Sequence, residues 1–335
     1  MLRPWLERIL DGGLLSVDEA RAAFDAVMAG APAAQVAGFL TALRLRGETD
    51  DEIEGAARSL RAHAQPLHHE LPVVLDTCGT GGDGAGTFNI STTVAFVCAG
   101  AGVAVAKHGN RAVSSRSGSA DVLEALGVPL IGDAVLARAA LSEDRFAFLF
   151  APAWHPAMRS VGAVRRELGV RTVMNLLGPL VNPARATHQL VGVYSLERVE
   201  PTARVLGRLG SRRAIVVHGD GALDELSLAG PTRVAVVSGP AVEVFDTHPE
   251  AIGLGSSPLS ALAGGDAQDN ARLLVALLEG QVGPRRDAVL LNAAWALFAA
   301  EAAESPVAGL ELARRALDSG AALAVLEAAR RRRTP

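Results

Sequence analysis

The residue types best suited to chemistry gather between Asp76 and Gly127. An apolar run at residues 72–75 predicts a short buried strand, and glycines follow it at positions 79, 81, 82, 84 and 86. Asn89-Ile90-Ser91-Thr92 then leads into an apolar helix, whose free N–H groups Asn89 and Ser91 are able to cap. Glycine lets backbone N–H groups approach a ligand closely, and a helix N-terminus adds partial positive charge. The stretch therefore predicts a site for an anion such as phosphate.

The glycine spacing also fits a dinucleotide-binding fingerprint, Gly79-x-Gly81-x-x-Gly84. That fingerprint needs an acidic residue about 20 positions further on, at the end of the second strand. Here the second expected strand, residues 103–106, ends in Lys107-His108-Gly109-Asn110-Arg111. A cation stands where NAD recognition needs a carboxylate, so the pattern favours a phosphate loop and not an NAD site. A Walker loop is excluded because no Gly-Lys-Ser/Thr follows the glycines.

Lys107 is the only lysine among the 32 lysine and arginine residues of the chain. Its position beside the glycine loop suggests a need for a compact ammonium, since a guanidinium is larger and flat. The alternative is chance survival at a tolerant position. We expect Lys107 to contact phosphate in a solvent-filled cleft. On that view Lys107→Arg would remove most activity and change thermal stability little.

The elements that position these residues divide the chain in two. Residues 1–68 show helical patterns alone, with Ser16 and Thr49 each placed to begin a helix. From residue 70 onward strands and helices alternate, which predicts an α/β domain with a mostly parallel central sheet. The other expected strands are 146–150, 190–194, 214–218, 233–237 and 242–245. Helical patterns lie near 134–142, 196–209, 268–279 and 286–302. In such sheets, ligands bind beyond the carboxyl ends of the strands.

Composition limits the classes of function. The 335 residues allow about two domains, and 49% hydrophobic with 20% charged residues indicates a globular protein. A net charge of −4 gives no sign of a nucleic-acid partner. Two cysteines suit a reducing compartment. We expect a cytoplasmic protein without a membrane partner, because charges interrupt the first apolar segment and the longest uncharged run, residues 84–106, contains Gly, Ser, Thr and Asn and is typical of a loop, a helix and a strand.

Asp224 and Glu225 follow the expected strand at 214–218. Adjacent carboxylates beyond a strand end suit Mg²⁺, a hard cation with oxygen ligands. Such a pair is by itself more typical of a solvated turn. By residue type alone, Arg165 is a helix-surface arginine.

Three motifs in order carry a family resemblance: residues 79–83 (GTGGD), 89–92 (NIST) and 107–111 (KHGNR), the last followed by Ser114-Ser115. The segments 43–49, 151–158, 164–172, 175–183 and 264–271 extend it. Over about residues 10–330, the chain resembles the anthranilate phosphoribosyltransferase family of tryptophan biosynthesis. The resemblance implies transfer of phosphoribose from phosphoribosyl pyrophosphate to the amine of anthranilate, with release of pyrophosphate.

The family's fold is nucleoside phosphorylase/phosphoribosyltransferase-like. The resemblance implies a helical domain at 1–68, completed by about 165–185, and an α/β domain at 70–164 and 186–335. It also implies a homodimer formed through the helical domain.

The resemblance assigns site residues by position. The residues that it implies for binding phosphoribosyl pyrophosphate are Gly79, Gly82, Asp83, Thr87, Asn89, Ile90, Ser91, Thr92, Lys107, His108, Gly109, Asn110, Arg111, Ala112, Val113, Ser114, Ser115 and Ser119. Anthranilate falls on Gly79, Asn110 and Arg165, and Mg²⁺ on Ser91, Asp224 and Glu225. No residue is predicted to be a general base.

Two alternatives stay open. A pyrimidine-nucleoside phosphorylase shares the fold and also cleaves a bond at ribose C1, but the anthranilate residues and the Asp224-Glu225 pair argue against it. A non-enzymatic nucleic-acid-binding paralogue would show a basic groove and degraded motifs. His155 either lines the tunnel for the aromatic acid or holds a loop. We expect Arg330–Arg333 to follow a helix, complement its dipole and fray in solvent.

Overall fold

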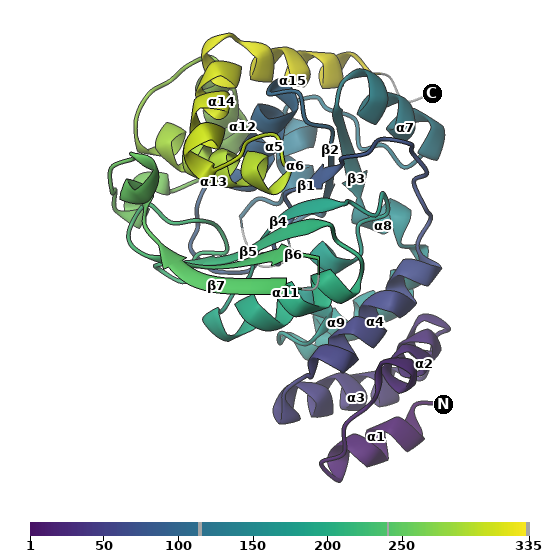
Figure 1. Ribbon diagram of the computed structural model, residues 1–335. Helices are drawn as coiled ribbons and strands as arrows, with labels where there is room; N and C mark the ends of the chain where they lie inside the picture. Colours follow the sequence, from purple (N-terminus) through teal and green to yellow (C-terminus); the bar gives the residue numbers. More distant parts are fainter. Residues whose placement is uncertain (113–115, 240, 333–335) are drawn as a thin grey trace.

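The computed structural model describes residues 1–112, 116–239 and 241–332. A small group of N-terminal helices lies at one end, beside a larger body with a twisted sheet between layers of helices (Figure 1). This architecture confirms the predicted fold class. Within the described ranges, no helix is both long enough and apolar enough to cross a membrane.

The N-terminal helices are α1 (Arg3–Leu10), α2 (Val17–Met28), α3 (Ala33–Arg46) and α4 (Asp50–His63). Ser16 caps α2, as predicted, and Thr49, within the segment 48–52 predicted to open a helix, caps α4. In each case the hydroxyl accepts from the backbone N–H three residues on, and Glu19 or Glu52 bonds back to the cap, forming capping boxes.

Two later helices, α9 (Arg159–Leu168) and α10 (Met174–Leu177), pack against this group. Val161 and Met174 share one hydrophobic core with Phe24 and Phe39. That packing suits the expected completion of the helical domain by about 165–185, although the domain boundaries themselves remain a prediction.

Ion pairs fasten the start of α4 to α11 (Val199–Arg208) in the larger body. Arg204 Nε lies 2.5 Å from Asp50 Oδ2, and Arg208 Nη1 lies 2.7 Å from Asp51 Oδ1. The helical group is therefore held to the sheet by charge as well as by apolar packing.

The described residues form a seven-stranded sheet in the order β3-β2-β1-β4-β5-β6-β7. The strands are β1 (Leu75–Asp76), β2 (Val105–Gly109), β3 (Phe146–Phe150), β4 (His188–Gly192), β5 (Arg213–Gly219), β6 (Thr232–Ser238) and β7 (Ala241–Thr247). Pairing from β3 to β5 is parallel, while β6 and β7 are antiparallel. Each predicted strand is present, with ends displaced by up to three residues. At β1 only two residues form the ladder, because the Val74 N–H donates to the Thr187 hydroxyl at 3.1 Å instead.

Helices cover both faces of the sheet (Figure 1). The remaining helices are α5 (Ile90–Gly100), α6 (Ser119–Ala125), α7 (Ala134–Glu143), α8 (Ala151–Trp154), α12 (Ala267–Leu278), α13 (Pro284–Ala299), α14 (Pro306–Asp318) and α15 (Ala321–Arg331). Helices α5 and α13 pack on one face, and α11 and α7 on the other. Neighbouring strand residues accordingly enter different cores: Leu190 joins the α5–α13 side and Val191 the α11 side.

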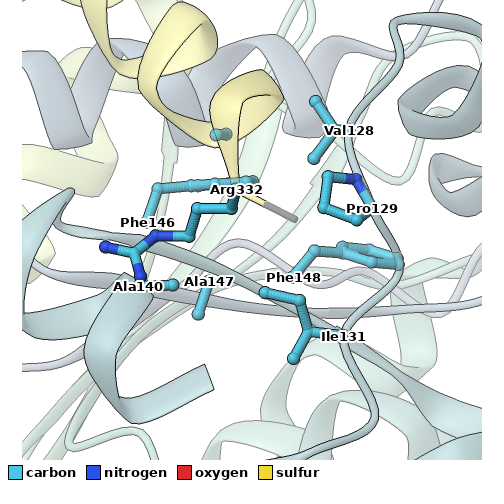
Figure 2. A pocket seen from close by; sticks show the side chains of 9 residues that line it. Val128, Pro129, Ile131, Ala140, Phe146, Ala147, Phe148 and Arg332 are labelled. Atoms are coloured by element: carbon cyan, nitrogen blue, oxygen red, sulfur yellow. The ribbon is translucent and has the colours of Figure 1, made fainter. Parts of the chain in front are cut away.

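Arg330 and Arg332 are held by contacts with the rest of the protein and not frayed, contrary to the prediction. Arg330 Nε donates to the Leu126 carbonyl oxygen at 2.7 Å. Arg332 pairs with Asp144, and with Glu143 at 2.7 Å. Arg332 also borders a small apolar hollow of about 10 Å³ between α15, α7 and β3 (Figure 2). Arg333 lies outside the described residues.

Candidate active site

The loops after β1, β4 and β5 meet at the carboxyl end of the sheet, where β1 lies between β2 and β4. This is a topological switch point, the usual ligand position in open α/β sheets. A Cβ on Gly192 would lie 1.4 Å from the Asp224 carbonyl oxygen, and one on Gly79 would lie 3.0 Å from Asp224 Oδ2. Thr80 N donates to the Gly192 carbonyl oxygen at 2.9 Å. Glycine at both positions therefore lets the three loops pack together.

Lys107, at the end of β2, is buried, and the prediction of a lysine in a solvent-filled cleft is wrong. The residue is only 2% exposed. Its Nζ donates to the Thr77 carbonyl oxygen at 3.1 Å, to Thr77 Oγ1 at 3.3 Å and to Ser91 Oγ at 3.2 Å. The loop after β1 and the start of α5 cover the ammonium. This tertiary contact leaves no local signal in the sequence.

The N-terminus of α5 is capped by a distant carboxylate. Ser91 N donates to Glu225 Oε1 at 3.1 Å. Asn89 begins the helix without a side-chain capping bond, which corrects the expectation for that residue. Its Oδ1 instead accepts from Asn270 Nδ2 at 2.9 Å, and its Nδ2 donates to the Ser117 carbonyl oxygen at 3.3 Å. The positive end of α5 thus faces Glu225.

Three carboxylates approach one another beside the glycine loop. Asp224 Oδ2 accepts from Gly81 N at 2.7 Å, and Asp224 N donates to Asp83 Oδ2 at 3.4 Å. Burial, followed by the charge of Asp83, raises the pKa of Asp224 to about 7. Burial, followed by the charge of Asp224, raises the pKa of Glu225 to about 8. Burial and mutual repulsion therefore disfavour the charged forms of Asp224 and Glu225 in the absence of a bound cation.

This donor set fits a magnesium ion. Carboxylate and hydroxyl oxygens are the ligands that Mg²⁺ takes, and a cation beside two buried carboxyls with raised pKa favours their ionised forms. The described side chains do not form a ready cluster of three or more His, Cys, Asp or Glu ligands. Asp224 and Glu225 with Ser91 match a cation that keeps waters and substrate oxygens among its ligands.

A buried hydrogen-bond network fixes the end of β2. Asp76 is fully buried, and burial raises its pKa to about 6. Its Oδ1 accepts from His108 N at 3.1 Å, and its Oδ2 accepts from Asn182 Nδ2 at 2.7 Å. Asn182 Nδ2 also donates to the Ala106 carbonyl oxygen at 2.7 Å. Asp76 and Asn182 therefore hold Lys107 and His108 in register with the segment after α10.

His108 and His155 face each other, with ring centroids 5.1 Å apart. His108 Nδ1 lies 3.0 Å from the Gly178 carbonyl oxygen. The Nε2 atoms of both rings are buried and have no hydrogen-bond partner within the described part of the chain. Burial lowers the pKa of His108 to about 3 and that of His155 to about 4. Both rings are therefore neutral near pH 7.

Arg165 lies in the last turn of α9, partly buried. Burial lowers the pKa of its guanidinium. Among the described residues, no hydrogen bond or ion pair satisfies this side chain. A partly buried cation without a protein anion suits an anionic ligand.

The segment after β2 is held by α6. Asn110 Oδ1 accepts from Arg111 N at 2.8 Å, and the Asn110 carbonyl oxygen accepts from Ser119 Oγ at 3.3 Å. Arg111 pairs with Glu124 at 2.7 Å, and Ala112 N donates to Asp121 Oδ2 at 2.9 Å. Gly109 is the last residue of β2 and pairs with Phe150 of β3. The predicted site residues Val113, Ser114 and Ser115 lie outside the described residues.

The remaining predicted residues line the same loop and helix. Thr87 pairs with Ala263 in an isolated bridge, and Ile90 and Thr92 are buried. The hydroxyls of Thr80 and Thr92 are buried and have no hydrogen-bond partner in the described structure. These hydroxyls are available to a ligand that reaches the loop.

Comparison with known proteins places the chain. The description "Glycosyl transferase family, a/b domain" matches residues 71–323, and "Glycosyl transferase family, helical bundle domain" matches residues 3–64. The anthranilate phosphoribosyltransferase of Moorella thermoacetica is 56% identical over 98% of this chain and 97% of its own length. The chain belongs to the anthranilate phosphoribosyltransferase family. The family member of Symbiobacterium thermophilum is 51% identical over 97% of this chain and 96% of its own.

Solved structures of anthranilate phosphoribosyltransferases share the fold. The enzyme of Thermus thermophilus aligns with a TM-score of 0.92 and 48% identity, over 97% of this chain and 98% of its own. The Saccharomyces cerevisiae enzyme in complex with phosphoribosyl pyrophosphate and Mg aligns at 0.88 with 31% identity, over 97% and 96% of the two chains.

Several residues of this site were not predicted from the sequence. Asp76 opens the stretch from Asp76 to Gly127 and Asn182 lies in the segment 175–183, yet nothing local indicated that they bond to each other across 106 positions. Arg171 contacts the glycine loop through Gly82. An aspartate at the end of a buried strand was the only available signal, because an unpaired carboxylate is rarely tolerated there.

Proposed function

We propose that the chain transfers phosphoribose from 5-phosphoribosyl 1-pyrophosphate to the amine of anthranilate, giving N-(5-phosphoribosyl)anthranilate and pyrophosphate in tryptophan biosynthesis. The observation that carries the proposal is the pairing of two features: a glycine loop with carboxylates at the switch point, and a desolvated arginine on α9 without a protein anion. The relatives named for this activity support it.

The donor side is the loop after β1 and the N-terminus of α5. Departure of pyrophosphate requires stabilisation of negative charge on the leaving oxygens. Backbone N–H groups of Gly79, Gly82 and Asp83, the hydroxyls of Thr80 and Thr92 and the positive end of α5 supply it, while the Thr80 and Gly81 N–H groups already bond within the protein. Lys107 acts from behind the loop, adding positive charge and holding the Ser91 hydroxyl. The other residues expected from the sequence to bind phosphoribosyl pyrophosphate, Thr87, 89–92, 107–115 and Ser119, remain part of the proposal.

The acceptor side is Arg165, with Asn110 and Gly79. The guanidinium attracts the carboxylate of anthranilate in a charge-assisted bond, and burial strengthens that attraction. The neutral amine attacks an electron-poor carbon, so no strong base is required, and we assign none. Holding the two substrates in line supplies much of the rate. A Saccharomyces cerevisiae relative solved in complex with 4-fluoroanthranilate supports an acceptor site of this kind.

Asp224, Glu225 and Ser91 would hold Mg²⁺. When bound, the ion neutralises charge on the pyrophosphate oxygens. The Saccharomyces cerevisiae relative in complex with phosphoribosyl pyrophosphate and Mg supports the assignment. Asp224→Asn combined with Glu225→Gln should keep the fold and raise the magnesium concentration at half-maximal rate. Unchanged magnesium dependence would reject these two residues as ligands.

A fluorescence assay tests the function. Purified protein with phosphoribosyl pyrophosphate and Mg²⁺ should quench the fluorescence of anthranilate and release one pyrophosphate for each anthranilate consumed. The parallel reaction, thymidine with inorganic phosphate, should give no thymine. Thymine formation without consumption of anthranilate would instead favour the pyrimidine-nucleoside phosphorylase alternative.

The homodimer is also part of the proposal. Leu10, Leu14 and Leu45 are exposed by 69%, 54% and 83% on the helical group. They lie on neighbouring chain segments, because Arg46 donates to the Gly13 carbonyl oxygen. Exposed apolar side chains on neighbouring segments are typical of contact surfaces.

A cytoplasmic location is proposed because Cys78 and Cys98 are free thiols. Fractionation of cells that express the chain would check it.

A further inference from the structure

Arg171 lies in the segment between α9 and α10 and is exposed at the surface. Its Nη2 donates to the carbonyl oxygen of Gly82, in the middle of the glycine loop. Its guanidinium carbon lies 4.7 Å from the centroid of the Tyr194 ring, which follows β4. A guanidinium stacked on an aromatic ring keeps its donors in a fixed plane. Stacking on the Tyr194 ring therefore orients the Arg171 guanidinium so that it donates to the Gly82 carbonyl oxygen.

The backbone of Arg171 is fixed from the other side. Arg44, near the end of α3, donates to the Arg171 carbonyl oxygen. Arg171 thus connects the helical group, the segment after α9 and the glycine loop. Arg165, proposed to hold anthranilate, lies six positions earlier in the chain, in the last turn of α9.

The contact falls where the glycine loop needs support. Gly82 has a φ of +74°, in the left-handed region, and its neighbours Gly81 and Gly84 have φ of +66° and +78°. A run of such residues has many alternative conformations in the absence of outside contacts. Gly81 N and Asp83 are held by the Asp224 loop, whereas the Gly82 carbonyl oxygen is held by Arg171.

We propose that Arg171 is a positioning residue that fixes the glycine loop in the conformation that binds phosphoribosyl pyrophosphate. It acts through the Gly82 carbonyl oxygen and does not touch the reacting atoms. The inference rests on the proposed function for its kinetic consequence, while the contact itself is independent of the reaction.

Kinetics give the first test. Arg171→Gln removes the charge and the stacked plane, and should raise KM for phosphoribosyl pyrophosphate about five- to tenfold, with KM for anthranilate changed less than twofold. Tyr194→Phe keeps the ring and should behave like the parent, whereas Tyr194→Leu should raise the same KM by a smaller factor. Arg159→Gln, an exposed arginine at the start of α9, is the matched control and should change neither KM.

Hydrogen exchange gives the second test, on the free protein without any substrate. Amides of residues 79–87 should exchange about five- to tenfold faster in Arg171→Gln than in the parent or in Arg159→Gln, while the α13 amides should be unchanged. Unchanged loop exchange would overturn the proposal. A raised KM with unchanged exchange would show direct contact between Arg171 and the substrate. If the parent lacks transferase activity but loop exchange rises, the proposed function fails and the positioning contact stands.

Discussion

At the scale of single residues, Lys107 shows most clearly how the site proposed for phosphoribosyl pyrophosphate limits substitutions. Its three hydrogen bonds and 2% exposure leave no room for a larger head group. Lys107→Arg should therefore abolish most activity and also lower the free energy of unfolding by about 1–3 kcal/mol. Urea denaturation of parent and variant measures this, with the exposed Arg138→Lys as control. A variant as stable and as active as the parent would contradict the buried placement.

The facing histidines predict a pH dependence of stability. Burial holds the pKa of His108 near 3 and that of His155 near 4, whereas an unfolded histidine titrates near 6.5. The unfolded state therefore binds protons first as pH falls. The free energy of unfolding contributed by each ring is full above about pH 6.5 and decreases toward its folded pKa, by up to about 1.4 kcal/mol per pH unit.

His155→Asn should flatten this dependence between pH 6.5 and 4.5, measured by urea unfolding. The exposed His68→Gln is the control and should retain the slope of the parent. Asp76 has a raised pKa and acts in the opposite sense, so the difference between variant and parent carries the test. Equal slopes in His155→Asn and parent would contradict the buried neutral ring.

Residue types and spacing sufficed to predict the phosphate loop, but not the contacts behind it. The glycines, Asn89–Thr92 and the single lysine are local patterns with local physical reasons. The burial of Lys107, the capping of α5 by Glu225 and the Asp76–Asn182 bond join residues 16 to 134 positions apart. No periodicity or composition encodes such pairings.

At the scale of elements, the existence and type of the helices and strands were predictable from the sequence, while the exact residues at which most of them begin and end were not. β3 was predicted at its observed bounds because the apolar run Phe146–Phe150 follows Arg145 and is soon interrupted by Pro152. The predicted bounds of β1 were wrong because the Val74 N–H donates to the Thr187 hydroxyl and so does not join the strand ladder. The apolar residues 72–75 alone do not indicate this bond. Helix starts with Ser or Thr and a following Glu were predicted correctly.

The C-terminal helix supplies the element-scale prediction. Arg332 closes one side of the apolar hollow in Figure 2 and pairs with Asp144 and Glu143 of the α7 region. Arg332→Gln should lower the free energy of unfolding by about 1 kcal/mol, since the pair is only partly exposed. Thermal and urea unfolding measure it. Arg331→Gln, at the exposed neighbouring position, should leave the free energy of unfolding unchanged. Equal losses in both variants would contradict a specific stabilising role for the ion pairs of Arg332.

The whole molecule raises the question of assembly. If the apolar surface of Leu10, Leu14 and Leu45 forms the contact between two copies, Leu45→Glu should shift the protein from dimer to monomer, because it buries a charge in an apolar interface. Light scattering after size exclusion at several concentrations measures this. Val282→Glu alters an equally exposed valine before α13, outside the helical group, and should leave the dimer intact. A dimer retained in Leu45→Glu would place the interface elsewhere.

The central claim is that the glycine loop binds phosphoribosyl pyrophosphate and that a separate arginine, Arg165, recognises anthranilate. The most direct measurement is the pair of KM values in Arg165→Ala. Loss of one charge-assisted bond is worth about 1.5–3 kcal/mol, or roughly tenfold to a hundredfold. The account predicts that increase in KM for anthranilate, with KM for phosphoribosyl pyrophosphate nearly unchanged and the thermal midpoint preserved. Equal increases for both substrates, or no increase for anthranilate, would contradict it.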